Sequence, residues 1–358
     1  MFKTVATAGF ALFSMFFGSG NLIFPFMLGR DALGSYPYVI LGLIITAVLV
    51  PIMGFIGLLL SDGDYDKYFS YLGKKGTFFL TLLMLCLMAP FGIIPRCICF
   101  SYGGVNVAFP DLQLWQFSIV FCAALALLVW RPNKVVAIIG NILTPFKLGG
   151  IVFLIFVGLR CAPAMTPSTI APIDNIITGI TTGYQTMDLL ASFFFAASIV
   201  EFIRQKEKDS KKIIKLSLYA GLLGSCLLTA VYSGFVTLSA AYGPQIKDFP
   251  AESLLAHISG FVLGDAAVYV VSFTITVSCL ATATILTKLF VEFLQNKILN
   301  NKLTYHTCVA ITLLISFLGS LLGFKTIVSW IFIMLSWLYP LLIVYSIYKL
   351  YEGLKASR

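Results

Sequence analysis

The chain has few charged residues and almost no histidine, and these shortages exclude whole classes of protein. Charged residues are 11% of the 358 positions, against roughly 25% in soluble domains. The only two histidines are His257 and His306, and neither adjoins the cysteines or carboxylates that a nucleophile or metal site requires. The eight cysteines show neither metal-ligand spacing nor a disulfide framework. We therefore expect no enzyme and no cofactor.

Long apolar runs recur along the whole chain instead. Hydrophobic residues make up 59% of it, and about 20 apolar residues are enough for a helix to cross a bilayer. The first run is too long, and too clearly interrupted, for a cleaved signal peptide. We predict an all-α membrane protein that forms one domain over 1–358, with ten transmembrane helices near 4–29, 37–60, 77–101, 115–130, 135–159, 176–201, 214–241, 262–294, 304–323 and 326–348.

The basic residues fit this topology. With a cytoplasmic N-terminus, four of the 24 Lys and Arg residues fall on the outer side, Arg96 and Lys147 lie within spans, and the other 18 are on the inner side. This positive-inside bias predicts a bacterial-type inner membrane protein with both termini cytoplasmic. The same loops account for the net charge of +9, so no nucleic-acid partner is expected. Segment 204–212 contacts membrane lipid or forms a solvated loop.

The most informative stretch is 9–25, where Gly18-Ser19-Gly20-Asn21 interrupts the first apolar run and Pro25 follows. Unwinding a helix inside hydrocarbon leaves backbone N–H and C=O groups that cost several kcal/mol each if they stay unpaired. Such a break is tolerated where it is buried in protein or lines a cavity, and there its backbone binds a solute or ion. The break therefore indicates a transporter.

Ten spans divide into two halves of five, 4–159 and 176–348, and an odd number of spans inverts the second half relative to the first. In such inverted repeats the first helix of each half is discontinuous. The corresponding helix near 176–201 contains Asp188 and Ser192, but it has no Gly or Pro after Gly183. Its break is much less evident from sequence than the first.

Three motifs together resemble a known family: 9–25, then Thr186-Met187-Asp188, then Cys279-Leu-Ala-Thr-Ala283. They are similar to those of the branched-chain amino acid:cation symporters, which have the LeuT-type five-plus-five inverted repeat. Members of that family usually have twelve spans, and we expect the two beyond the tenth to lie outside the transport core. The resemblance implies import of Leu, Ile or Val by cation symport through alternating access. The sequence does not indicate the oligomeric state.

The chemistry of an amino acid predicts how the first break is used. The N-terminus of the second half-helix suits a carboxylate, which assigns substrate binding to Phe17, Gly18, Ser19, Gly20 and Asn21. Asn21 alternatively caps that half-helix. Across the cavity, the resemblance implies that the second break is lined by Ala191, Ser192 and Phe193. The run Phe193–Phe195 forms an apolar wall for the substrate side chain, or simply packs against other helices.

The resemblance also implies a sodium site, formed by the carbonyls of Ser14, Phe17 and Ser278 and by the side chains at 281 and 282. Thr282 supplies a hydroxyl there, whereas Ala281 does not.

One charged residue within a span, Lys147, complicates this sodium site. Lys147 lies mid-span, where a charge is costly unless it is paired or hydrated. We hypothesise that its ammonium occupies or borders the cation position, so that the coupling ion is H+ rather than Na+. Alternatively, Lys147 pairs with Asp188 or snorkels. Asp188 is functional or bonds the frayed backbone, and Arg96 is expected to snorkel from near the outer end of its span.

Two other functions remain open. One is an exchanger, or a symporter for another small apolar solute. The other is a channel or receptor, which is less favoured because an open pore needs rings of polar residues.

Overall fold

The computed structural model describes residues 2–130 and 144–356, and every regular element in these ranges is helical. The first half contains α1 (Phe2–Phe16), α2 (Ser19–Ala32), α3 (Tyr36–Ile44), α4 (Val50–Leu60), α5 (Tyr65–Tyr68), α6 (Gly73–Met88), α7 (Ile93–Ala108), α8 (Leu114–Trp130) and α10 (Thr144–Arg160). The second half contains α11 (Pro172–Tyr184), α12 (Asp188–Arg204), α13 (Ser210–Ala241), α14 (Gly243–Ile246), α15 (Leu254–Leu263), α16 (Asp265–Phe293), α17 (Tyr305–Ser320) and α18 (Phe324–Ala356).

Short irregular turns connect several of these helices. A π turn, η2 (Ile45–Leu49), joins α3 to α4 directly before Pro51, a residue that cannot donate a backbone hydrogen bond. Another π turn, η6 (Leu294–Ile298), extends α16. One-turn 3-10 helices occur at η1 (Leu33–Ser35), η3 (Ser70–Leu72) and η5 (Ala251–Ser253).

The helices overlap the predicted spans, but several bounds differ. The span predicted at 77–101 is two helices, α6 and α7, separated by turns at 89–92. Gly264 has a φ of 84° and separates α15 from α16, so the helix predicted at 262–294 begins at Asp265. The predicted start of the fifth span, 135–143, lies outside the described residues. Among the described residues, five helical segments can cross a membrane by length and composition, or six if the bent pair α11–α12 is one span. The number ten stays a prediction.

Two broken helices lie at the centre of the molecule. The first is α1–α2, interrupted at Phe17–Gly18, and the second is α11–α12, interrupted at Gln185–Met187 with a bend of 46°. Each is covered by a helix of the opposite half: α13 packs against α1 and α2, whereas α3 and α4 pack against α11 and α12. The second helix of each half therefore supports the other half's break.

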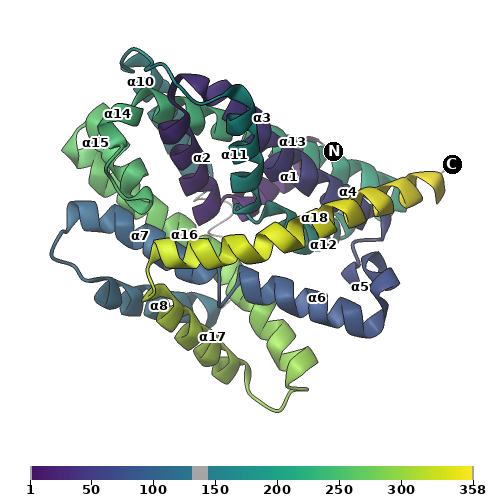
Figure 1. Cartoon of the computed structure of the whole chain (residues 1–358). Coiled ribbons are helices and arrows are strands. Elements are labelled where there is room, and N and C mark those ends of the chain that lie inside the picture. Colours follow the sequence, from purple (N-terminus) through teal and green to yellow (C-terminus); the bar gives the residue numbers. More distant parts are fainter. Residues whose placement is uncertain (1, 131–143, 357–358) are drawn as a thin grey trace.

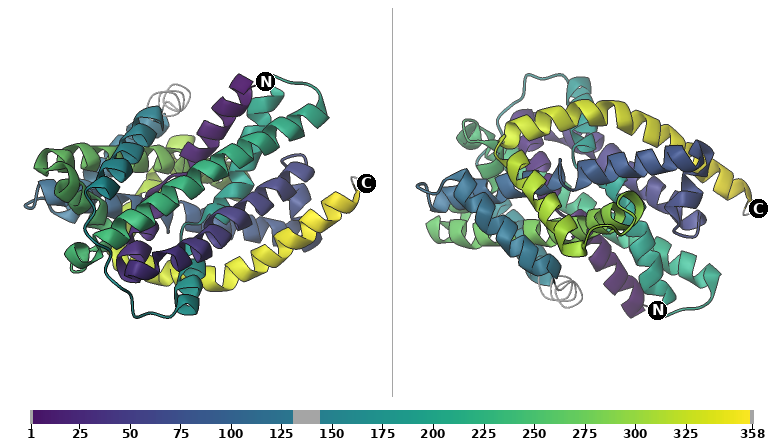
Figure 2. Two further views of the ribbon diagram at one scale, coloured as in Figure 1. Left: turned by 90° about the horizontal axis from the view of Figure 1, so that it is seen from above. Right: turned by 90° about the horizontal axis from the view of Figure 1, so that it is seen from below.

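Figure 1 shows how the remaining helices surround this centre. Helix α18 crosses the front of the bundle, and α8 and α17 lie beside each other below it. The N-terminus, the C-terminus and α5 lie toward one end of the bundle, and α14 and α15 lie toward the other. Figure 2 shows the same placement of both termini from two further directions. The two breaks lie deep between these ends.

Candidate functional site

The first break forms where the sequence predicts it, because Gly18 takes an extended conformation (φ −109°, ψ −158°) between two helices. The Gly18 amide donates to the side-chain Oδ1 of Asn21 at 3.1 Å, so Asn21 caps α2 as the alternative reading expected. Helix α2 begins at Ser19, and its first amide groups have no acceptor within the helix. These groups form a positively polarised N-terminus in the centre of the protein.

The second break lies earlier than predicted. Ala191, Ser192 and Phe193 are inside α12, and the chain is irregular at Gln185–Met187 instead. Met187 adopts a left-handed conformation with φ 61°, which costs a residue other than glycine on the order of 1–3 kcal/mol. The Thr186 hydroxyl donates to the Gly183 carbonyl at 2.9 Å. The break itself contains neither glycine nor proline, and this local polar contact is one of those that support it.

A polar cluster joins the two breaks. The Asn21 amide nitrogen donates to both carboxylate oxygens of Asp188, at 2.9 Å each. The Tyr232 hydroxyl of α13 donates to Asp188 Oδ2 at 2.8 Å and also contacts the Asn21 amide. All three side chains are at most 2% exposed. Asp188 therefore holds the start of α12 against the start of α2.

Arg96 is part of this centre, and the prediction that it snorkels is wrong. The predicted span ended at 101, but α7 continues to Ala108, which places Arg96 about 18 Å from the helix end at 1.5 Å per residue. Its side chain is 1% exposed. Its Nη1 donates to the Gln185 carbonyl at 2.7 Å, and its Nε donates to the Ser19 hydroxyl at 3.3 Å. The guanidinium therefore connects the second break to the first.

A small cavity of about 20 Å³ lies where these groups meet. Among the described residues that line it, Arg96 is the one cation and Asp188 the one anion. The others are backbone or polar groups of the two breaks together with apolar side chains: Met15, Phe16, Gly18, Ser19, Gly20, Asn21, Met88, Ile93, Thr186, Ala191, Phe195, Thr282 and Leu286. A cavity of this size holds about one water molecule.

The residues predicted around the second break point in different directions. Ala191 lines the cavity. Ser192 donates to the Leu189 carbonyl at 2.7 Å, and Phe193 packs against Tyr68 at a ring distance of 5.4 Å. Successive residues of a helix point about 100° apart, so three consecutive side chains cannot share one cavity. Of the three phenylalanines, Phe195 lines it.

The region predicted for a cation contains the Lys147 ammonium. Lys147 Nζ donates to the Phe17 carbonyl at 3.1 Å and lies 4.9 Å from the Phe17 ring centre. The predicted ion pair between Lys147 and Asp188 is absent: neither residue takes part in any ion pair over 2–130 and 144–356. The 5% exposure of Lys147 also argues against snorkelling.

The other predicted cation ligands lie in α1 and α16. Ser14 is half-buried in α1, whereas Ser278, Ala281 and Thr282 are buried in α16. Within 2–130 and 144–356 the Thr282 hydroxyl has no hydrogen-bond partner, and it lies beside Gly18. A cavity of about 330 Å³ between α10, α15 and α16 ends at Lys147 and Ser278. The ion-binding roles of these residues stay predictions.

Comparisons with known proteins bear on this arrangement. The profile of a family described as "Branched-chain amino acid transport protein" matches residues 1–357. The branched-chain amino acid permease BrnQ of Corynebacterium glutamicum is 28% identical over 354 residues, which cover 98% of this chain and 82% of that protein. The permease BraB of Bacillus subtilis is 31% identical over 360 residues, covering 96% and 78%.

A solved structure shares the fold. MhsT in complex with L-phenylalanine matches with a TM-score of 0.58 at 15% identity, over 87% of this chain and 78% of MhsT. At this identity the likeness shows the fold alone. It is the LeuT-type fold that the sequence motifs imply.

Proposed function

The chain belongs to the branched-chain amino acid transport protein family, and from this premise we propose that it imports leucine, isoleucine or valine by cation-coupled alternating access. It is an integral membrane protein and a transport protein rather than an enzyme. One observation carries the proposal: a single cavity contains one cation, one anion, a free helix N-terminus and apolar walls. An apolar α-amino acid has the complementary parts.

The substrate carboxylate binds at the start of α2. The amides of Ser19 and Gly20 head that helix, and helix N-termini favour anions. Arg96 lies beside them: a Cβ atom at Gly20 would be 2.8 Å from Arg96 Nη2. Glycine at this position keeps the backbone accessible to both the guanidinium and a carboxylate.

The substrate ammonium faces Asp188, the only carboxylate among the described residues around the cavity. The aliphatic side chain contacts the apolar wall, which includes Phe16 and Phe195 at a ring distance of 5.4 Å. The cavity of about 20 Å³ is far below the roughly 300–1,000 Å³ typical of ligand sites. Binding therefore widens it, and this requires the half-helices α1 and α12 to separate, as alternating access demands.

The coupling ion in this proposal is H+, carried by Lys147. Its ammonium already donates a hydrogen bond to the Phe17 carbonyl, which is one of the ligands expected for Na+. Two unit charges 4 Å apart repel by about 4 kcal/mol at an effective dielectric constant of 20, so a bound Na+ would compete with the ammonium. In this proposal, water that enters the cavity between α10, α15 and α16 carries the proton to Lys147, because the lining itself is mostly apolar.

The proposed location is a bacterial-type inner membrane, with both termini in the cytoplasm. The termini and α5 lie toward the same end of the bundle (Figure 1), and most Lys and Arg residues fall on that side of the predicted topology. The end that bears α14 and α15 then faces outward.

The test is counterflow of labelled leucine in proteoliposomes, followed by uptake with Na+ and pH gradients imposed separately. We expect counterflow, and we expect uptake driven by an inward proton gradient but not by Na+ alone. Absence of counterflow with any branched-chain amino acid would overturn the proposed substrate class. Uptake driven only by Na+ would overturn the proposed ion. Uptake that always needs internal amino acid would identify an exchanger.

A further inference from the structure

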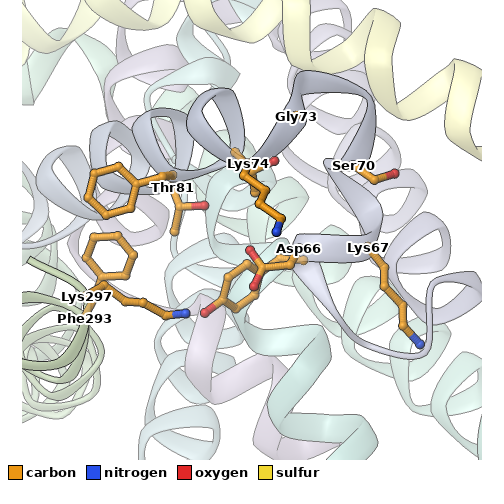
Figure 3. A pocket seen from close by; sticks show the side chains of 11 residues that line it. Asp66, Lys67, Ser70, Gly73, Lys74, Thr81, Phe293 and Lys297 are labelled. Carbon is orange, nitrogen blue, oxygen red and sulfur yellow. The ribbon is translucent and has the colours of Figure 1, made fainter.

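A third cleft, of about 640 Å³ and larger than the two cavities above, lies where α5, the start of α6 and the end of α16 with η6 meet (Figure 3). In Figure 3 the charged ends of Asp66, Lys74 and Lys297 converge on its interior. None of these three forms an ion pair with another described residue. Lys67 points away and pairs with Asp62 at 2.9 Å. The cleft thus presents unpaired charges of both signs.

The floor of the cleft contains a buried hydroxyl that has no partner. Thr81 is 2% exposed, and its Oγ1 makes no hydrogen bond within the described structure. Figure 3 shows this hydroxyl directed into the cleft. Thr77, one turn earlier in α6, donates to the Phe69 carbonyl at 2.9 Å. Because a buried polar group without a partner is costly, a hydroxyl at this wall of the cleft favours a polar ligand group or water beside it.

The cleft and the central cavity are lined by the same faces of two helices. In α6, Met88 lines the cavity and Thr81 lines the cleft; in α16, Leu286 lines the cavity and Phe293 the cleft. Each pair is seven residues apart, and residues at this spacing share a helix face. At 1.5 Å per residue the two spaces are separated by about 10 Å. The cleft lies toward the end that we assign to the cytoplasm.

We propose that this inner cleft is a second binding site for the transported amino acid, between the central cavity and the cytoplasm. The proposal rests on the function and topology proposed above. The ammonium groups of Lys74 and Lys297 bind the substrate carboxylate, and Asp66 binds the substrate ammonium. The Thr81 hydroxyl contacts the solute at the floor, and the stacked rings of Phe78 and Phe293, 5.7 Å apart, contact its aliphatic side chain. The cleft volume lies within the range of small-molecule sites.

The test measures half-saturation for leucine separately on the two membrane faces, with the full chain in right-side-out and everted vesicles. The variants are the double substitution Lys74→Gln/Lys297→Gln and the single Thr81→Val. For the double variant we expect the half-saturating concentration at the cytoplasmic face to rise about five- to tenfold, as expected for the loss of two solvated charge contacts. Thr81→Val also raises the half-saturating concentration at the cytoplasmic face. For both variants, the half-saturating concentration at the outer face changes less than about twofold.

Lys67→Gln is the matched control, because this lysine borders the same cleft but is paired outside it. We expect it to leave the half-saturating leucine concentration unchanged on both membrane faces. If neither Thr81→Val nor the double variant alters the cytoplasmic face while the unaltered protein shows counterflow, the inner site is refuted and the proposed function stands. Equal changes on both faces would also refute it. If the effect of the double variant disappears in proteoliposomes of phosphatidylcholine alone, the cleft binds an anionic lipid headgroup and the proposal is wrong.

Discussion

Lys147 offers the sharpest test of how transport is coupled to an ion. Replacing it with Met removes the ammonium that donates to the Phe17 carbonyl and leaves a side chain of similar length. We expect uptake driven by a pH gradient to be lost, whereas leucine counterflow, which needs no net ion movement, continues. Lys147→Arg separates charge from proton release, because arginine stays protonated in proteins. It too is expected to lose pH-driven uptake.

The same substitution is expected to create a response to Na+. With the ammonium gone, a cation at this position no longer meets a repulsion of about 4 kcal/mol, which corresponds to roughly a thousandfold in affinity. The Phe17 carbonyl is released, and the Thr282 hydroxyl already lacks a partner. Adding a hydroxyl with Ala281→Ser in the Lys147→Met background strengthens the Na+ response further. Lys147→Arg keeps the positive charge, so this variant is expected to gain no Na+ response.

The assay is initial uptake of labelled leucine in proteoliposomes at a series of Na+ concentrations and outer pH values. Leucine uptake by the unaltered protein is expected to slow as the outer pH rises, because Lys147 must acquire a proton from outside. If Lys147→Met leaves both uptake and its pH dependence unchanged, the proton hypothesis is wrong. If pH dependence is lost but Na+ never stimulates uptake, the ammonium does not stand in for a cation.

Three further substitutions test the centre of the site. Gly20→Ala places a Cβ atom 2.8 Å from Arg96 Nη2 and 3.2 Å from the Thr186 Cα, so leucine counterflow should fall at least about tenfold. Gly149→Ala, which meets nothing within 4 Å, should leave it unchanged. Arg96→Met leaves the Gln185 carbonyl without its donor and should destabilise the protein by about 1–3 kcal/mol, measured as a lower thermal midpoint in detergent. Asp188→Asn removes the charge and leaves one oxygen to accept where two accept now, so leucine counterflow should fall at least about tenfold and the thermal midpoint should also drop; unchanged counterflow would show that the charge is not needed.

The sequence predicts the first break but not the second, and the two breaks explain this difference. Gly18 and Gly20 free the backbone locally, so the interruption is visible in the residues themselves. At Gln185–Met187 there is neither glycine nor proline, and the segment with the left-handed Met187 is supported by local contacts and by contacts from elsewhere. One of these comes from Arg96, which is 89 residues away in sequence from Gln185. Single-sequence reasoning cannot detect a break maintained by a distant side chain.

The same limit explains the other residues that the sequence did not indicate. Arg96 appeared to be near a helix end because the apolar run weakens after 101, although the helix continues to Ala108. Tyr232 is one of 16 tyrosines, and nothing local distinguishes it from those that pack against lipid. Its role follows from α13 lying against the first broken helix. By contrast, Lys147 and Asp188 were found from composition alone, since charges within spans are rare.

The polarity of the first break itself links ion to solute. A helix interrupted at Phe17–Gly18 exposes carbonyls at the end of α1 and amides at the start of α2. The Phe17 carbonyl accepts from Lys147, and the amides that follow face the cavity beside Arg96. In the proposed mechanism, cation and carboxylate are therefore held by adjacent ends of one backbone segment, at Gly18, which lies beside Thr282 of α16. A movement of this segment would change both contacts in the proposed mechanism, which is what coupling between two ligands requires.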